Sequence, residues 1–522
     1  MRKRIYSVLF CVLLVVMTIC HKQYEPGTQP GGLFGEQVSL NLWYTDEELT
    51  DYLNSVCLYY QEETGVRVVP RLVSGLQYLD ALSESSIAAS DEFADVFIVS
   101  NDALGRTYLS GLSIPVAKQS QVEHGYPAAA VSAVTYKGKQ VAYPLYYETA
   151  VLLCNETYLD QMAAAAIQAD ADALEGEQAQ AMADNASDED MEAMALSGAG
   201  DDGSLDISQG DIEKRKGQMI PATVEELLTI ADEYDAPENV EAILSWDVTD
   251  IFYNYFFVGG VLNLGGETGD DVGQITVYSD LAVNALSIYQ SLNQFFSIEA
   301  QKVSYEGVLS EFMEGKTIFT IATTDAIGRL EQAKADGTFP YAYKVAKLPS
   351  TDPEVLARSM SVTYGVAVNG FGTHTEEADD FAYALAKGLD ESFYEKTGKV
   401  PAKKGIAFTN DQMKAVEEEY DQSAPVPKML ETSNFWMMLE ATFTEIWNGA
   451  DVESSLRALD TKVRQQLGLE SVEEEQMTEE QPSQEALPLD EAGDNAVSDN
   501  AVSGNGVSAN QVSSNSMSLG ND

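Results

Sequence analysis

The order of hydrophobic and polar residues along the chain predicts alternating strands and helices. Residues 38–44 alternate between apolar and polar, which indicates a strand with one buried face. A helix is predicted over 47–63 with a stop at Gly65, and a short strand follows at 66–69. The run 94–100 (ADVFIVS) is mostly apolar, as in a parallel-sheet strand buried on both faces. This alternation predicts an α/β architecture.

Two acidic segments depart from this pattern. Residues 163–216 are rich in Ala, Asp, Glu and Gly, and 163–213 hold 14 acidic and no basic residues. We expect a disordered or loosely helical surface insertion there, because so few large apolar side chains cannot offset the entropy of ordering. Residues 470–522 hold 12 acidic and no basic residues and contain a five-residue repeat that begins DNAVS at 494–498. We expect a disordered, solvated tail.

The first twenty residues have the pattern of an export signal. Basic residues at 2–4 precede an apolar run, Ile5–Ile19, that is short for a membrane-spanning helix. Cys20 stands where a lipoprotein carries its acylated cysteine, although Ile19 replaces the small residue usual before it. An uncleaved anchor, or cleavage further on, stays open. Residues 21–36 predict a flexible linker, so we expect an exported protein held at the outer face of the cytoplasmic membrane.

Composition narrows the class of function. The 522 residues predict two or three domain-sized units, and 45% hydrophobic residues allow a large core. A formal net charge of -54 argues against a nucleic-acid partner, whose binders carry basic faces. With three histidines, and with Cys57 and Cys154 as the body's two cysteines, we expect no metal site, no cofactor, no disulfide framework and two buried thiols. No G-x-S-x-G or H-E-x-x-H motif occurs, so no catalytic residues are assigned.

Seven stretches in order resemble the family 1 extracellular solute-binding proteins of the maltose-binding type. No single stretch is diagnostic; their order and spacing over about residues 38–468 carry the resemblance. The stretches are Leu42–Glu48, Glu63–Val68, Ala94–Asp102, Gly138–Glu148 with Leu152–Asn155, Ala222–Leu227, Phe312–Ile321 and Ser433–Met437.

The resemblance implies an α/β, two-lobed periplasmic-binding-protein-like fold of type II, with a hinge of several crossing strands and a ligand cleft between the lobes. Lobe 1 is expected over 38–146 plus about 360–415, and lobe 2 over 147–359 plus about 425–468. It also implies a non-enzymatic protein that delivers a small ligand, a mono- or oligosaccharide, to the permease subunits of an ABC importer.

A sugar site needs carboxylates to accept hydroxyl hydrogen bonds and aromatic rings to stack on the sugar. The resemblance places such side chains in the first loop, after the buried strand, in the hinge strand and in two later segments. The candidate ligand-binding residues are Trp43, Tyr44, Asp46, Glu47, Asp102, Glu148, Asp325 and Trp436. Asp247, Asp250 and Tyr253 fall in the other lobe's equivalent region.

Several candidates have a structural alternative. Asp46 and Asp102 each precede an expected helix and could serve as its N-cap. Trp436 starts an apolar helical run and could be a core residue. Glu148 is harder to explain structurally, because it interrupts the apolar run YPLYYETAVLL and a buried carboxylate needs a partner.

Two departures from the maltodextrin binders affect the expected ligand. The buried strand exits through Val99-Ser-Asn, and the later segment reads Ala322-Thr-Thr-Asp325; both lack the usual tryptophan. Fewer stacking rings favour a shorter or more polar ligand, with Asp325 as a hydroxyl or amine acceptor. Two alternatives stay open: a binding protein for a non-sugar solute, and an exported glycan hydrolase that uses paired carboxylates.

Overall fold

The computed structural model describes residues 38–88, 92–185, 207–296, 298–429 and 434–469. Within them, strands from distant parts of the chain join one large sheet in the order β2-β1-β3-β12-β6-β10-β7. Its strands are β1 (Ser39–Tyr44), β2 (Arg67–Leu72), β3 (Val96–Ser100), β6 (Tyr143–Asn155), β7 (Ala242–Ser245), β10 (Thr317–Thr323), β11 (Tyr343–Ala346), β12 (Met360–Val368), β13 (Val400–Pro401) and β14 (Ala424–Pro425). Two short hairpins join β4 (Thr135–Tyr136) to β5 (Lys139–Gln140), and β8 (Asn263–Leu264) to β9 (Ile275–Thr276).

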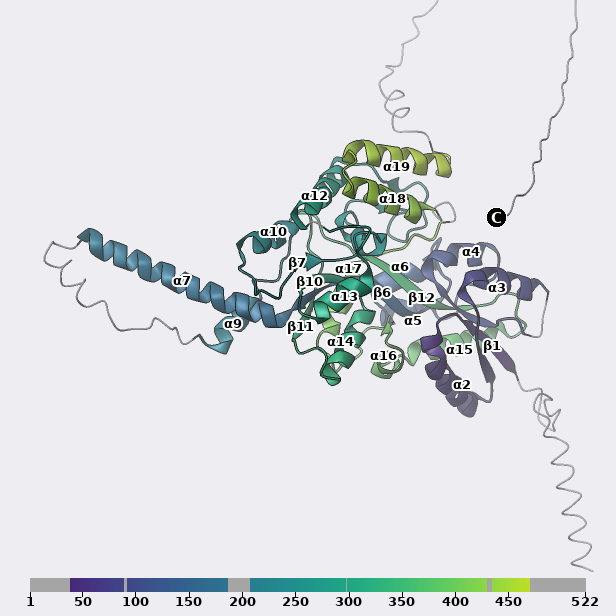
Figure 1. Cartoon of the computed structure of the whole chain (residues 1–522). Helices are drawn as coiled ribbons and strands as arrows, with labels where there is room; N and C mark the ends of the chain where they lie inside the picture. Colours follow the sequence, from purple (N-terminus) through teal and green to yellow (C-terminus); the bar gives the residue numbers. More distant parts are fainter. Residues whose placement is uncertain (1–37, 89–91, 186–206, 297, 430–433, 470–522) are drawn as a thin grey trace, which may run out of the picture. The chain divides into compact units, whose positions relative to one another are not determined.

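The pairing directions divide this sheet at β6. On one side β1 runs parallel to β2 and β3, while β12 lies antiparallel to both β3 and β6. On the other side β6 is antiparallel to β10 and β11, and β10 is parallel to β7. One thirteen-residue strand therefore pairs with both halves of the sheet (Figure 1).

The helices pack in two groups. Those around the first half of the sheet are α2 (Thr50–Thr64), α3 (Tyr78–Ile87), α4 (Leu104–Leu109), α5 (Gln119–Gly125), α6 (Ala128–Val134), α15 (Thr375–Lys387), α16 (Glu391–Thr397) and α17 (Met413–Gln422), with the 3-10 turns η1 (Glu47–Leu49), η2 (Gly75–Gln77) and η3 (Asn101–Ala103). The others are α7 (Glu156–Asn185), α9 (Gln209–Lys216), α10 (Val224–Glu233), α11 (Ile251–Asn254), η4 (Tyr255–Phe257), α12 (Asp280–Phe296), α13 (Tyr305–Met313), α14 (Asp325–Ala335), α18 (Phe435–Trp447) and α19 (Val452–Leu467).

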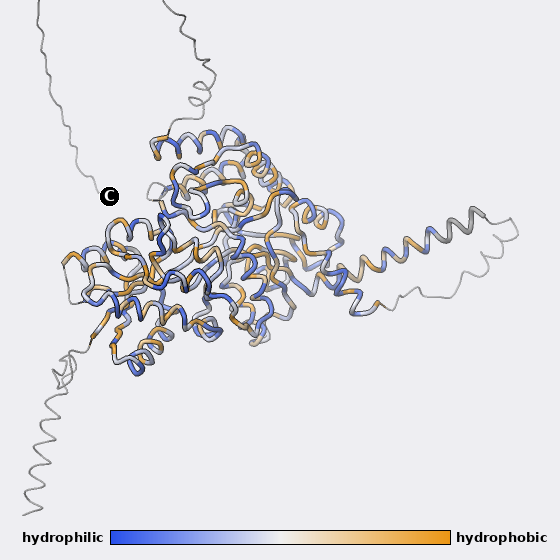
Figure 2. Tube along the Cα trace, turned by 180° about the vertical axis from the view of Figure 1, so that it is seen from behind, coloured by the Kyte–Doolittle hydropathy of each residue, from blue (hydrophilic) through white to orange (hydrophobic). Residues whose placement is uncertain are grey.

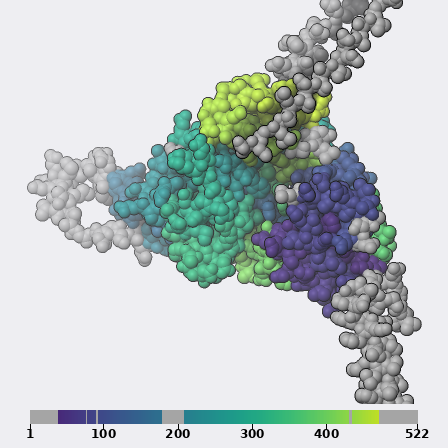
Figure 3. Space-filling model, turned by 45° about the vertical axis from the view of Figure 1, so that its right-hand side comes forward, coloured from purple at the N-terminus to yellow at the C-terminus, as the bar shows by residue number. Residues whose placement is uncertain are grey.

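Two hydrophobic cores follow this division except at α13 and α14, which contribute to the first core. The first gathers buried residues of β1, β3, β12, α2, α15 and α16, and it extends to α13 and α14. The second gathers α12, α18, α19, β7 and η4. Figure 2 shows the outer helices alternating between hydrophobic and hydrophilic along their length, as amphipathic helices do. Figure 3 shows α18 and α19 in yellow, packed over the teal middle part of the chain.

Local sequence signals account for several element boundaries. Gly65 takes a left-handed conformation (φ 77°) and caps the end of α2. Thr223, the N-cap of α10, accepts the Glu226 amide, and the Glu226 carboxylate accepts the amide of Ala222, one residue before the N-cap, an arrangement close to a capping box. Both boundaries follow from residue types that the sequence displays directly.

The acidic segment 163–216 contains the outer part of α7 and the whole of α9; residues 186–206 lie outside the described residues. Alanine is the strongest helix former, which favours a helix where the sequence is Ala-rich. Lys216, 4% exposed, holds α9 against the base of α7 through Glu156 at 2.8 Å. The expected tail, 470–522, also lies outside the described residues.

The two body cysteines are buried and free, as expected. Burial raises the pKa of Cys57 to about 12 and raises that of Cys154 as well. Within the described part of the chain, no helix is both long and apolar enough to span a bilayer.

Candidate functional site

The candidate site is built on β6 at the point where this strand changes partners. Up to Thr149, β6 pairs with β12, and from Ala150 onward it pairs with β10. Glu148 lies one residue before this change, on the same face of the strand as Tyr146. The most polar residue of the hinge strand therefore stands between the two halves of the sheet.

Lys399 is the partner that the Glu148 carboxylate requires. It precedes β13, whose pairing with β6 brings it beside Glu148. Its Nζ lies 3.4 Å from Glu148 Oε1, 3.2 Å from Asp46 Oδ2 and 2.9 Å from Glu48 Oε2. We call these four residues the hinge cluster.

Asp46 has two roles in this cluster. Its Oδ1 accepts the amide of Glu48 at 3.0 Å and so caps the 3-10 turn η1 that follows β1. Its Oδ2 faces Lys399 and also accepts a hydrogen bond from the Tyr146 hydroxyl at 3.4 Å. The capping bond fixes the rotamer that directs the second oxygen to the cluster.

Burial and charge oppose each other at Glu148 and Lys399. Burial raises the pKa of Glu148; the ammonium of Lys399 lowers it, and the charges of Asp46 and Asp325 raise it again, so the result lies above the usual value. Burial by itself would lower the pKa of Lys399, but the hydrogen bond to Glu48 and the charges of Glu148 and Asp46 outweigh it and raise the pKa. The lysine is therefore held in its charged form.

Two stacked rings adjoin the hinge cluster. The rings of Tyr146 and Tyr364 are parallel within 9°, with centroids 4.4 Å apart. Tyr364 lies on β12 beside Tyr146. Burial raises the pKa of Tyr364, and the charges of Glu148 and Asp102 raise it further, so these carboxylates lie within electrostatic range of the ring.

A second polar group comes from β10 and the helices next to it. The Tyr305 hydroxyl donates to Asp325 Oδ1 at 3.0 Å and lies 2.9 Å from Thr323 Oγ1. The Tyr305 ring stacks on Tyr253 at 5.1 Å and 15°. Asp247 Oδ2 accepts the Tyr305 amide at 3.0 Å and fixes the start of α13. We call Tyr253, Tyr305, Thr323 and Asp325 the Tyr305 cluster.

The two clusters are electrostatically coupled. After burial and the charge of Asp46, the charge of Asp325, the first residue of α14 after β10, also raises the pKa of Glu148 on β6. Together they present carboxylates that accept hydrogen bonds, tyrosine hydroxyls that donate or accept, and two stacked ring pairs. This chemistry suits a neutral molecule with many hydroxyl groups.

The eight candidates predicted from the sequence do not all lie together. Asp46 and Glu148 belong to the hinge cluster, and Asp325 belongs to the Tyr305 cluster. Glu47 is exposed in η1, where its neighbour Glu48 makes the contact with Lys399. Asp102 is exposed, and its carboxylate accepts the hydroxyl of Ser100.

The three aromatic candidates pack into the protein. Trp43 is 5% exposed and its ring faces the guanidinium of Arg71, while Tyr44 is 2% exposed and donates to Thr50 at 3.1 Å. Trp436 is partly buried in the first turn of α18, edge-on to Tyr255 at 5.6 Å. The rings beside the clustered carboxylates are instead tyrosines. Cys20, the candidate lipid-attachment residue, lies outside the described residues.

Sequence reasoning missed six residues of the two clusters and their rings: Glu48, Lys399, Tyr146, Tyr364, Tyr305 and Thr323. Lys399 follows Gly398, which ends α16 in a left-handed conformation, and a short strand comes next. That local pattern marks a turn but not the partner, because Glu148 lies 251 positions earlier. The tyrosines of YPLYYE stand out in the sequence, but which rings they stack on depends on the register between β6 and β12.

Solved structures with a similar fold are two-lobed binding proteins. An extracellular solute-binding protein from Staphylococcus aureus in complex with maltose has a TM-score of 0.62 and 18% identity, over 83% of this chain and 99% of that one. A cyclo/maltodextrin-binding protein complexed with maltotetraose has a TM-score of 0.63 and 18% identity, over 84% and 99%. This chain has the fold of the maltose-binding proteins.

A third similar structure, the maltose-binding periplasmic protein MalE from Listeria monocytogenes in complex with maltose, has a TM-score of 0.56 and 17% identity, over 86% of this chain and 100% of that one. Because nearly the whole length of each neighbour is covered, the two-lobed, type II fold expected from the sequence is confirmed for the body of the chain. No family model matches the sequence, and no curated protein matches it.

Proposed function

We propose that this chain is a non-enzymatic solute-binding protein whose ligand, a mono- or oligosaccharide, is held between the hinge cluster and the Tyr305 cluster. The observation that carries the proposal is the position of Glu148 and Lys399 at the change of partners in β6, within electrostatic range of Asp325, which begins α14 just after β10. A ligand contacted by both clusters would join the two lobes, as in hinge closure.

The roles of individual residues follow from their chemistry. Glu148, Asp46 and Asp325 would accept hydrogen bonds from sugar hydroxyls, and the Lys399 ammonium would donate one. Tyr364 and Tyr305, the partly exposed members of the two stacked pairs, would contact the apolar face of a sugar ring. The similar solved structures contain maltose or maltotetraose, which supports a carbohydrate ligand.

We further propose that the protein is exported, is anchored at the outer face of the membrane through Cys20, and delivers its ligand to the permease subunits of an ABC importer. This part rests on the basic and apolar leader in the sequence and on the fold. Palmitate labelling of the wild type and of Cys20→Ser tests the anchor: label on the wild type alone supports it, and equal label on both contradicts it.

Thermal unfolding with a ligand panel tests the sugar assignment. A ligand at 100 times its dissociation constant stabilises the folded state by about 2.7 kcal/mol, so a true ligand raises the melting temperature. We expect the shift from one or more mono- or oligosaccharides and none from polyamines or from amino acids without a ring. A shift from polyamines or from amino acids without a ring, and none from any sugar, would reject the sugar and keep the fold.

A further inference from the structure

A pocket lies behind the hinge strand, away from the face that carries Glu148. Its volume is about 300 Å³, and it is lined by residues of β6, β13 and α17, by Pro127 just before α6, and by residues 403–405 after β13. Tyr147 of β6 contributes to this pocket, and successive side chains of a strand point to opposite faces. The pocket is therefore separate from the hinge cluster.

Two stacked tyrosines form the inner wall. The rings of Tyr147 and Tyr420 are parallel within 6°, with centroids 3.6 Å apart. The Tyr420 hydroxyl is hydrogen-bonded to Thr363 at 2.7 Å. The Tyr147 hydroxyl is buried and has no hydrogen-bond partner among the described residues, although Tyr147 is 2% exposed. A buried hydroxyl without a partner is costly, so a missing partner is indicated here.

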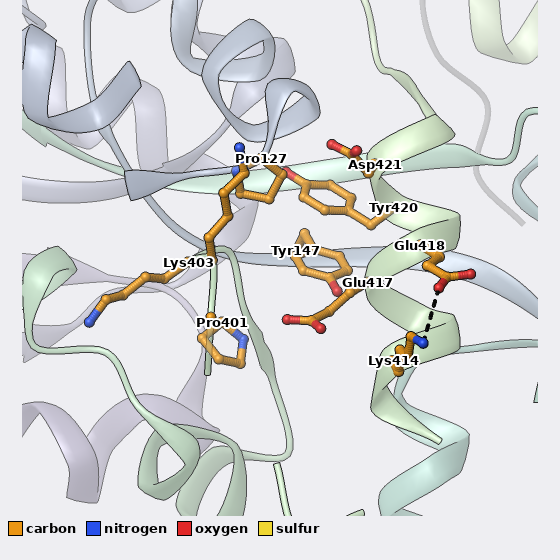
Figure 4. Close-up of a pocket in the computed structure, with 11 residues that line it drawn as sticks. Pro127, Tyr147, Pro401, Lys403, Lys414, Glu417, Glu418, Tyr420 and Asp421 are labelled. Carbon is orange, nitrogen blue, oxygen red and sulfur yellow. Dashed lines mark ion pairs between the residues drawn. The ribbon is translucent and has the colours of Figure 1, made fainter. Parts of the chain in front are cut away.

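The carboxylate of Glu417 lies within electrostatic range of this hydroxyl. Figure 4 shows the hydroxyl end of Tyr147 and the Glu417 side chain on the same side of the pocket, near Pro401. Burial raises the pKa of Glu417, and in the described part of the chain no cation offsets that rise. The charge of Glu417 in turn raises the pKa of Tyr147, after burial and Tyr420.

The lysines at the pocket are directed elsewhere or lie at its rim. The Nζ of Lys403 donates to the carbonyl oxygens of Lys387 at 2.7 Å and Leu389 at 2.8 Å. Lys414 is 82% exposed and lies 3.9 Å from Glu418, while Lys404 is exposed. The half-buried Glu417 carboxylate therefore faces the pocket without an ion pair to any described residue.

We propose that this pocket is a second binding site for a small, ring-bearing primary amine. The ammonium would pair with Glu417 and share a hydrogen bond with the Tyr147 hydroxyl, and the ring would lie against Pro127 and Pro401. The net charge of -54 adds a long-range field that attracts cations to the protein. The Glu417 carboxylate would then have an ion-pair partner and the Tyr147 hydroxyl a hydrogen-bond partner. Neither has such a partner among the described residues.

Saturation-transfer NMR of the full chain with benzylammonium tests the site, with neutral benzyl alcohol as the matched ligand. Glu417→Gln removes the charge and keeps the shape; Tyr147→Phe removes the hydroxyl and keeps the stack. Glu395→Gln, on the exposed face of α16, is the control variant. Circular dichroism establishes that each variant is folded.

We expect saturable benzylammonium binding that falls about tenfold with Glu417→Gln and less with Tyr147→Phe, because charge-assisted hydrogen bonds are the stronger ones. Glu395→Gln should bind benzylammonium as tightly as the wild type does. The wild type should bind benzyl alcohol no more tightly than Glu417→Gln binds benzylammonium. No saturable signal with the wild type, or binding unchanged in Glu417→Gln, would overturn the proposal.

Discussion

At the scale of residues, Lys399 holds several carboxylates in one place. Its side chain is 16% exposed, against 22% for Asp46 and 35% for Glu148. Such partly buried groups interact more strongly than surface pairs, because less water screens them. Removing the lysine would therefore leave two poorly solvated carboxylates facing each other.

Lys399→Met should lower the free energy of unfolding by about 1–3 kcal/mol at pH 7, the usual cost of a buried group left without its partner. The loss should shrink at pH 5, because without the lysine the pKa of Glu148 rises further and protonation relieves the repulsion. Urea unfolding at both pH values measures this. Lys414→Met, at an 82% exposed lysine, is the control; equal losses in both variants would contradict the account.

Glu419 should make the stability of the protein depend on pH. It is 2% exposed, and burial raises its pKa from 4.5 to about 6. A raised pKa favours the protonated form in the folded state, so stability is full below pH 4.5 and falls as pH rises through 6. The loss is about 2 kcal/mol, at 1.36 kcal/mol per pKa unit.

Glu419→Gln should remove this dependence, since glutamine stays neutral and keeps an oxygen for the Leu348 amide, which Glu419 accepts at 3.3 Å. Chemical unfolding at several pH values from 4.5 to 7 measures the free energy of unfolding of both proteins. Relative to the variant, the wild type should lose about 2 kcal/mol of this free energy as the pH rises. A constant gap across this range would show that Glu419 keeps an ordinary pKa.

At the scale of elements, Lys216 is the most buried of the charged contacts that attach α9 to α7; the more exposed Arg215 of α9 also lies 3.2 Å from Asp170 of α7. Lys216 lies 2.8 Å from both Glu156 of α7 and Glu213 of its own helix, and its side chain is 6% exposed. Removing one member of a buried ion pair commonly costs about 3–5 kcal/mol, and the partial exposure of Glu156 and Glu213 reduces that.

We therefore expect Lys216→Met to release α9 from α7. Amide hydrogen exchange should become faster over 209–216 and at the start of α7, and stay unchanged in β6. Lys214→Met, two positions earlier and exposed, should leave the exchange of α9 as it is. Equal exchange in both lysine variants would mean that Lys216 does not hold the helix.

Several elements could be predicted from the sequence because their signals are local. The apolar run at 94–100 contains β3, which lies between β1 and β12 and is buried over most of its length. The stop at Gly65 and the capping residues of α10 fall where the residue types indicate. Each of these features depends on neighbours within a few positions.

The rest depends on contacts that local sequence does not encode. Trp43 precedes a loop, but β1 is paired on both sides and the ring is buried under Arg71. Lys399 reaches Glu148 only because β13 aligns with β6 in one register. The resemblance identified the hinge strand and its carboxylate; it did not identify the cation that completes the site.

At the scale of the whole molecule, the account requires that segments from both halves of the sheet contact one ligand. Glu148 comes from the hinge strand and Asp325 from the start of α14. If the ligand contacts only one of these residues, its affinity should not change when the other residue is substituted. If the ligand lies between them, its affinity should fall with either substitution. Affinity measured on both variants separates these cases.

The most direct test is isothermal titration calorimetry of the wild type, Glu148→Gln and Asp325→Asn with the sugar that gives the largest thermal shift. Each variant keeps its shape and loses one charged acceptor. We predict 1:1 binding to the wild type and a loss of about 10- to 150-fold in each variant, since a hydrogen bond to a charged group is worth about 1.5–3 kcal/mol. Glu395→Gln should bind as the wild type does. Sugar binding that is unchanged in both Glu148→Gln and Asp325→Asn would contradict the proposed site.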